Sequence, residues 1–126
     1  MKFKYYVPDG RFAHERNDCV VRTLVITLGL KYAEAHRVAR EIAERKDKKG
    51  CNLHVIMEYF RIRHVKTKGL GRNRFGFPTL AQIAPLLETG RYILRVKNHA
   101  FAVINGVQYD HSENGDRKRI LDVYEF

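Results

Sequence analysis

The sequence feature that most constrains the fold is a change in hydrophobic periodicity along the chain. Up to about residue 60 the apolar residues recur at intervals of three and four, which is typical of amphipathic helices. From residue 91 onwards apolar and polar residues alternate, which is typical of strands with one buried face. Helices followed by strands predict an α+β fold, with an N-terminal helical lobe packed on a C-terminal antiparallel sheet.

Four helices are predicted. The first spans residues 19–28 and has Asp18 as a natural N-cap. The second spans about residues 32–45 and the third about residues 52–60, each with apolar residues on one face. The fourth spans about residues 79–87 and opens on a Thr-Leu-Ala-Gln run with the spacing of a capping box.

The second half of the chain predicts strands joined by tight turns. Residues 91–97 and 100–104 alternate as strands, and the dipeptide Asn105-Gly106 that follows is the strongest short signal for a two-residue hairpin turn. Residues 107–110 then form the returning strand of that hairpin. Residues 119–126 are predicted as a last strand.

Composition places the chain in one class. The 126 residues are 44% hydrophobic and 30% charged, which suits a single folded domain over residues 1–126 and argues against disorder. No apolar run approaches the roughly 20 residues of a membrane span, and no secretory signal is visible at the N-terminus, so we expect a cytoplasmic protein without a membrane partner. Two cysteines are too few for a disulfide framework.

The chain is strongly basic, with a formal net charge of +10. Residues 61–77 hold six Lys and Arg residues, no acid and three glycines, and are interpreted as an exposed strand or loop. Its cations, Arg72 and Arg74 among them, and the interleaved phenylalanines suit a nucleic-acid backbone and bases. The same segment suits an acidic peptide at the rim of a cleft, or is only a solvated face.

Cys19 occupies the first turn of the first predicted helix. Unpaired backbone N–H groups and the positive end of the helix dipole favour a thiolate at such a position. The alternative interpretation is a buried cysteine without chemistry.

His99 is the second candidate catalytic residue. If Asn105-Gly106 form a two-residue turn, the register brings His99 and Asp110 to one face of the hairpin as diagonal neighbours. A carboxylate at that position is able to hold an imidazole nitrogen. The alternative is an ordinary surface contact.

Together these residues form the ordered set of a thiol acyl-transfer enzyme: a nucleophile at a helix N-terminus, a base on a later strand and an acid on the next strand. The motifs are Asn17-Asp18-Cys19-Val20-Val21-Arg22-Thr23-Leu24, then Asn98-His99-Ala100-Phe101-Ala102-Val103-Ile104-Asn105-Gly106, then Tyr109-Asp110. They resemble the papain-like cysteine peptidases, and most of all small phage and bacterial members related to the double-glycine leader peptidases. The resemblance covers the first helix and the hairpin, whereas the middle third of the chain matches weakly.

The resemblance implies a papain-like fold and a thiol hydrolase that cleaves a peptide or isopeptide bond without a cofactor, in the host cytoplasm if the chain is phage-encoded. Cys19 would be the nucleophile, His99 the general base and acid, and Asp110 the orienting acid. The family commonly has a Gln six residues before the nucleophile as an oxyanion donor, but that position here is Ala13. Asn17 is a candidate substitute, unless it is only a turn residue.

Other residues are candidates of less weight. His14 is a second candidate oxyanion donor. Cys51 and His54 are three residues apart and could join Cys19 and His99 in a zinc site, but the separation of Cys19 and Cys51 lacks the tight paired spacing of structural zinc sites, so no metal site is predicted.

Two functional hypotheses follow. The first is the thiol hydrolase, with a peptide or protein as its substrate. The second is a catalytically weak or inactive papain-like fold that serves as a basic binding module for nucleic acid or for a host protein. The net charge, the basic segment 61–77 and the absent oxyanion Gln favour the second.

Overall fold

The computed structural model describes six stretches of the chain: residues 2–5, 19–43, 53–67, 76–97, 99–110 and 119–126. Its helices are α1 (Cys19–Leu28), α2 (Tyr32–Ala43), α3 (Leu53–Tyr59) and α4 (Leu80–Ile83), with a 3₁₀ helix, η2 (Ala84–Leu87), after α4. Its strands are β1 (Lys2–Tyr5), β2 (Arg63–Lys66), β3 (Arg91–Val96), β4 (His99–Ile104), β5 (Val107–Asp110) and β6 (Asp122–Glu125). Within the described residues, no helix combines the length and apolar character that a membrane crossing requires.

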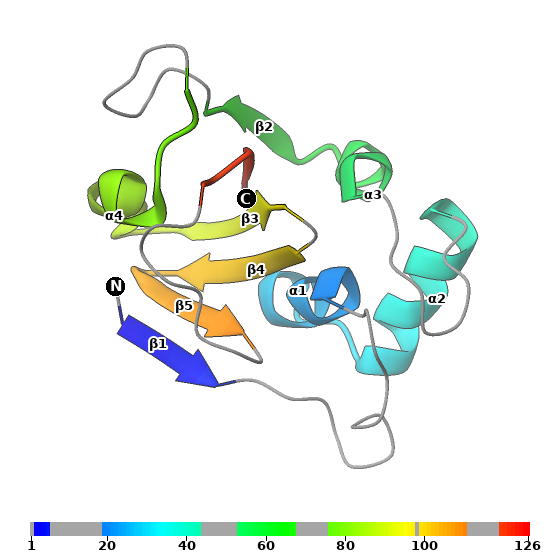
Figure 1. The fold of residues 1–126 in the computed structure, drawn as a ribbon. Helices are drawn as coiled ribbons and strands as arrows, with labels where there is room; N and C mark the ends of the chain where they lie inside the picture. The colour runs from blue at the N-terminus through cyan, green and yellow to red at the C-terminus, as the bar shows by residue number, and fades with distance from the viewer. Residues whose placement is uncertain (1, 6–18, 44–52, 68–75, 98, 111–118) are drawn as a thin grey trace.

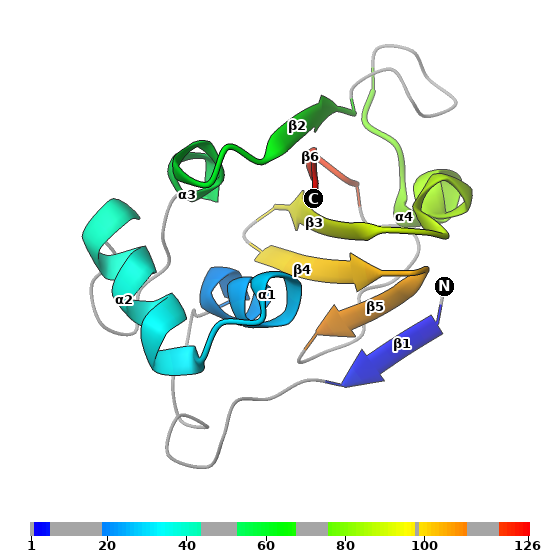
Figure 2. The ribbon, with the colours of Figure 1, turned by 180° about the vertical axis from the view of Figure 1, so that it is seen from behind.

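The six strands form one mixed sheet in the order β1-β5-β4-β3-β6-β2 (Figures 1 and 2). All neighbours are antiparallel except β1, which pairs in parallel with β5. The α+β class is therefore confirmed, but the expected division into N-terminal helices and a C-terminal antiparallel sheet is too simple. Both edge strands come from the first two thirds of the chain. Each has only four residues, too few for alternation to distinguish a strand from a loop.

The sheet is covered on both faces, so two apolar clusters form (Figure 2). On one face α1, α2 and α3 pack against residues such as Ile93 and Ala100. On the other face α4 and η2 pack against residues such as Leu94 and Phe101. Successive residues of a strand point to opposite faces, so the neighbours Ile93 and Leu94 belong to different clusters. The apolar runs of β3 and β4 are therefore buried on both sides.

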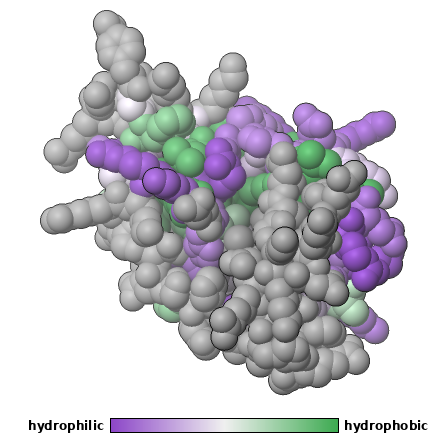
Figure 3. Space-filling view, turned by 45° about the vertical axis from the view of Figure 1, so that its right-hand side comes forward, coloured by the Kyte–Doolittle hydropathy of each residue, from purple (hydrophilic) through white to green (hydrophobic). Residues whose placement is uncertain are grey.

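The outer surface is mixed. Figure 3 shows hydrophilic and hydrophobic residues side by side on the described part of one face. The large hydrophobic residues most exposed among the described ones are Val55, Tyr59 and Leu86. Val55 and Tyr59 lie one turn apart on α3. Such scattered apolar residues are normal on a protein surface.

The predicted helices agree closely with the structure where it describes them. The bounds of α1 are those predicted, whereas Asp18 lies outside the described residues. The capping box at Thr79 is present. The Thr79 hydroxyl accepts from the Gln82 backbone N–H, and the Gln82 Oε1 accepts from the Thr79 backbone N–H. The fourth helix does not continue as an α-helix to Leu87, because Pro85 has no N–H to donate and the chain tightens into η2.

The predicted hairpin forms with its expected register. Ile104 pairs with Val107, and the two pairs beyond follow in step. Asn105 and Gly106 have φ values of 48° and 78°, and residues with positive φ at both central positions match the right-handed twist of the strands. The Asn105 side chain also accepts a hydrogen bond from the Gly90 backbone N–H at 3.0 Å, which fixes the turn.

We expect Gly106→Ala to lower the free energy of unfolding by about 1 kcal/mol, because an L side chain is strained at this φ although the space around it is adequate. Gly29→Ala is a matched control, since Gly29 has φ 69° and open space around it but ends α1. Urea denaturation measures both losses. Hydrogen exchange should then accelerate in β4 and β5 for Gly106→Ala only. Equal acceleration in both variants would show that the turn does not specifically hold the hairpin.

Candidate functional site

The hairpin brings His99 and Asp110 together. The imidazole Nε2 of His99 lies 2.7 Å from Oδ2 of Asp110, and the two side chains are 17% and 3% exposed. This is the contact that the register of the hairpin predicts. A carboxylate this well buried stabilises a positive charge on the ring more than a solvated one does, because less water screens the interaction.

The local structure fixes the orientation of the His99 ring. His99 is the first residue of β4, and Asp110 is the last residue of β5. The ring stacks on Phe101 on the same face of β4, with a centroid distance of 6.2 Å and an interplanar angle of 29°. Asp110 contacts Nε2, which orients the ring and places Nδ1 on the side away from this carboxylate.

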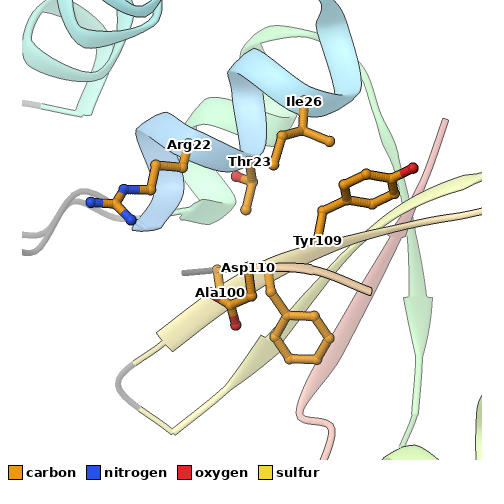
Figure 4. A pocket seen from close by; sticks show the side chains of 7 residues that line it. Arg22, Thr23, Ile26, Ala100, Tyr109 and Asp110 are labelled. Atoms are coloured by element: carbon orange, nitrogen blue, oxygen red, sulfur yellow. The ribbon is translucent and has the colours of Figure 1, made fainter. Parts of the chain in front are cut away.

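The first turns of α1 lie beside this end of the hairpin. A small cavity of about 10 Å³, room for about one water molecule, lies between the helix and the strands. It is lined by Arg22, Thr23, Ile26, Ala100, Phe101, Tyr109 and Asp110 (Figure 4). Asp110 therefore contacts His99 and also belongs to the lining of this cavity beside α1.

Cys19 is the first residue of α1. Arg22 and Thr23, which line the cavity, follow it by about one helical turn. Residues at i, i+3 and i+4 share one side of a helix, so Cys19 belongs to the side that carries Arg22 and Thr23. The N-terminus of α1 thus lies at the end of the sheet where β4 begins and β5 ends. The Cys19 side chain lies outside what the structure describes.

Alternation restricts how these parts meet. α1 packs on the face that carries Ala100, whereas His99 lies with Phe101 on the opposite face. A contact between Cys19 and His99 therefore has to form around the end of the sheet. Both residues are the first of their elements, and both elements begin at that end.

The remaining candidate site residues lie outside the described part of the chain. Among them are the candidate oxyanion donors Asn17 and His14 and the basic residues Arg72 and Arg74. The described part of the basic segment includes β2, at the sheet edge and three strands from β4. At about 4.8 Å per strand this is about 14 Å, so β2 does not line the rim of the His99 site.

A second group of polar side chains, which the sequence does not predict, lies on the α3 side of the sheet. Asp122 on β6 accepts from the Arg95 Nε at 2.6 Å and lies 2.6 Å from the Nε2 of His64. His54 on α3 contacts the Tyr124 hydroxyl and lies 3.7 Å from Asp122. These contacts join α3 and β2 to the centre of the sheet.

The surroundings of Tyr124 shift the pKa of its phenol. Burial raises the pKa of its phenol well above the ordinary value of 10.0, and the negative charge of Asp122 raises the pKa further. The folded state therefore holds the phenolic proton more tightly than the unfolded chain does.

The sign of the effect on stability follows by linkage. Below pH 10 the phenol is protonated in both states, so its contribution to the free energy of unfolding does not change with pH. Above pH 10 the unfolded chain loses the phenolic proton first. We expect the free energy of unfolding to fall as the pH rises beyond about 10, and this fall to be smaller in Tyr124→Phe. Urea denaturation at pH 7 and across the alkaline range measures it. An unchanged alkaline slope in Tyr124→Phe would contradict the assignment.

Among the described residues, no three His, Cys, Asp or Glu side chains are grouped so as to hold a metal ion. Cys51 lies outside those residues, and His54 is engaged with Tyr124.

Comparisons of the chain with protein-family models, with curated proteins and with solved structures found no match. Functional inference therefore depends on the site itself.

Proposed function

We propose that the protein is a papain-like thiol hydrolase that cleaves a peptide or isopeptide bond and acts in the cytoplasm. The observation that carries this proposal is the buried bond between His99 Nε2 and Asp110 Oδ2, at the end of the sheet beside the N-terminus of α1. Three supports are independent of the resemblance: the hairpin register, the burial of Asp110 and the position of Cys19 in α1.

In this proposal Cys19 is the nucleophile. As the first residue of a ten-residue helix, it experiences the positive end of the helix dipole, which favours the thiolate over the thiol. The sulfur attacks the carbonyl carbon of the scissile bond, the C–O π bond opens, and the oxygen carries the negative charge.

His99 transfers the proton and Asp110 orients the ring. His99 Nδ1 takes the thiol proton and returns it to the leaving amine when the C–N bond breaks, which leaves an acyl-enzyme thioester. Water, deprotonated by the same nitrogen, then hydrolyses the thioester and releases the acid. Asp110 holds Nε2 throughout, so that Nδ1 is the nitrogen that exchanges the proton.

The oxyanion requires donors close to Cys19. The backbone N–H of Cys19 is one, since the first N–H groups of a helix have no partner within the helix. Asn17, two residues before it, is proposed as the side-chain donor in place of the family's Gln. A donor of this kind contributes about 10²- to 10³-fold in rate.

The first test is the reactivity of the two cysteines. We expect iodoacetamide to modify Cys19 faster than Cys51 in the folded protein near pH 7, because only a thiolate reacts rapidly. Peptide mapping by mass spectrometry after graded exposure measures both rates in one sample. Cys19→Ser and Cys51→Ser assign the signals. Equal rates, or an unmodified Cys19, would argue against a nucleophilic role.

The second test separates the His99–Asp110 pair from a structural pair. We expect His99→Ala to slow the labelling of Cys19 by about tenfold or more near pH 7, because the imidazolium that stabilises the thiolate is lost. His64→Ala is the matched control, since His64 also contacts a carboxylate, Asp122, at 2.6 Å. Circular dichroism confirms that both variants are folded. The proposal fails if the two variants slow labelling equally or neither does.

A further inference from the structure

Among the described residues, the outer edge of β2 has no strand paired with it. β2 is the last strand of the sheet and pairs with β6 on one side only. Within the described part of the chain no element pairs with its other side, and Figures 1 and 2 show no labelled element beyond it. Such an edge presents backbone N–H and C=O groups that are able to extend the sheet.

Side-chain contacts also hold β2 against the neighbouring part of the sheet. The hydroxyl of Thr67, directly after β2, donates to the Ile120 and Leu121 carbonyl oxygens at 2.9 and 2.8 Å. His64 contacts Asp122 at 2.6 Å across the strand pair. Because these bonds hold β2 in an extended form before any partner arrives, a pairing segment need not organise it, and less conformational entropy is lost on binding.

The charge at this edge selects the kind of segment that fits. Arg61, two residues before β2, is exposed, and the Arg63 side chain is 74% exposed. Residues 61–67 contain no acid, and the carboxylate paired with Arg63 is Glu125 of β6 at 3.5 Å. A second copy of β2 would place like charges opposite one another, which is unfavourable, whereas an acidic strand would place opposite charges there.

We propose that the outer edge of β2 docks an extended acidic segment of a protein partner, which adds to the sheet as a further strand. Backbone hydrogen bonds supply affinity, and carboxylates near Arg61 and Arg63 supply selectivity. The site is distinct from the proposed hydrolase site, because β2 is separated from β4 by β6 and β3. Failure of either proposal leaves the other intact.

The test uses the full chain and a fluorescein-labelled peptide of about eight residues that alternates Glu and Val. We expect saturable binding by fluorescence anisotropy, and a loss of affinity of about two- to fivefold in Arg63→Gln, as expected for one cross-strand charge pair. Lys31→Gln is the matched control, since Lys31 is an exposed cation in the connection between α1 and α2. Its affinity should remain that of the parent chain.

Two further probes identify the mode of binding. A peptide of the same charge with Pro in place of Val lacks half of the backbone N–H groups, so it should bind much more weakly. A single-stranded oligonucleotide should not compete at equal concentration. Equal binding of the Pro peptide, equal losses in Arg63→Gln and Lys31→Gln, or displacement by the oligonucleotide would each overturn the proposal. Undiminished binding in Cys19→Ala would show that the docking site is independent of the hydrolase site.

Discussion

The packing of α1 on β4 is the contact on which the rest of the structure depends. β4 lies inside the sheet and is buried on both faces. On the α1 side it carries Ala100 and Ala102, whose small side chains allow the helix to approach closely, whereas on the other side it carries the larger Phe101. A close helix with a defined register fixes where its N-terminus lies. The two alanines therefore help to set where the N-terminus of α1 lies relative to the start of β4, together with the hydrogen bond from Arg91 of β3 to the Thr27 carbonyl oxygen of α1.

The parts of the fold that the sequence predicts are those that local interactions determine. The helical period and the two-residue turn involve residues a few positions apart, and so α1 and the β4–β5 register are as predicted. The parallel pairing of β1 with β5 joins Lys2 to Val107, and no local pattern encodes a contact across that separation. The position of β2 beside β6 has the same origin, since four residues of strand carry too little periodicity to be assigned.

The polar contacts, too, include one that the sequence predicts and one that it does not. The contact between His99 and Asp110 spans eleven residues through one turn, so counting along the hairpin predicts it. The contact between His64 and Asp122 spans 58 residues and is nearly identical in length, but no turn connects the two strands directly. The described surroundings of the two carboxylates differ: Asp122 also binds the guanidinium of Arg95, and Asp110 belongs to the lining of the cavity beside α1. The distance within a histidine–aspartate pair therefore does not distinguish a catalytic pair from a structural one. The residues that surround the pair do.

The position of the positive charges on the sheet indicates which kind of partner the basic composition favours. A net charge of +10 spread evenly over the surface would favour any polyanion, without preference for shape. At β2, however, exposed arginines accompany a strand edge that no described element pairs with, and a phosphate backbone has no N–H groups with which to complete the hydrogen bonds of a sheet. An extended acidic polypeptide satisfies both the charge and the backbone. If both proposals hold, the sheet binds a partner along one edge and carries the proposed hydrolase site at the end of β4, with β3 and β6 between the two sites.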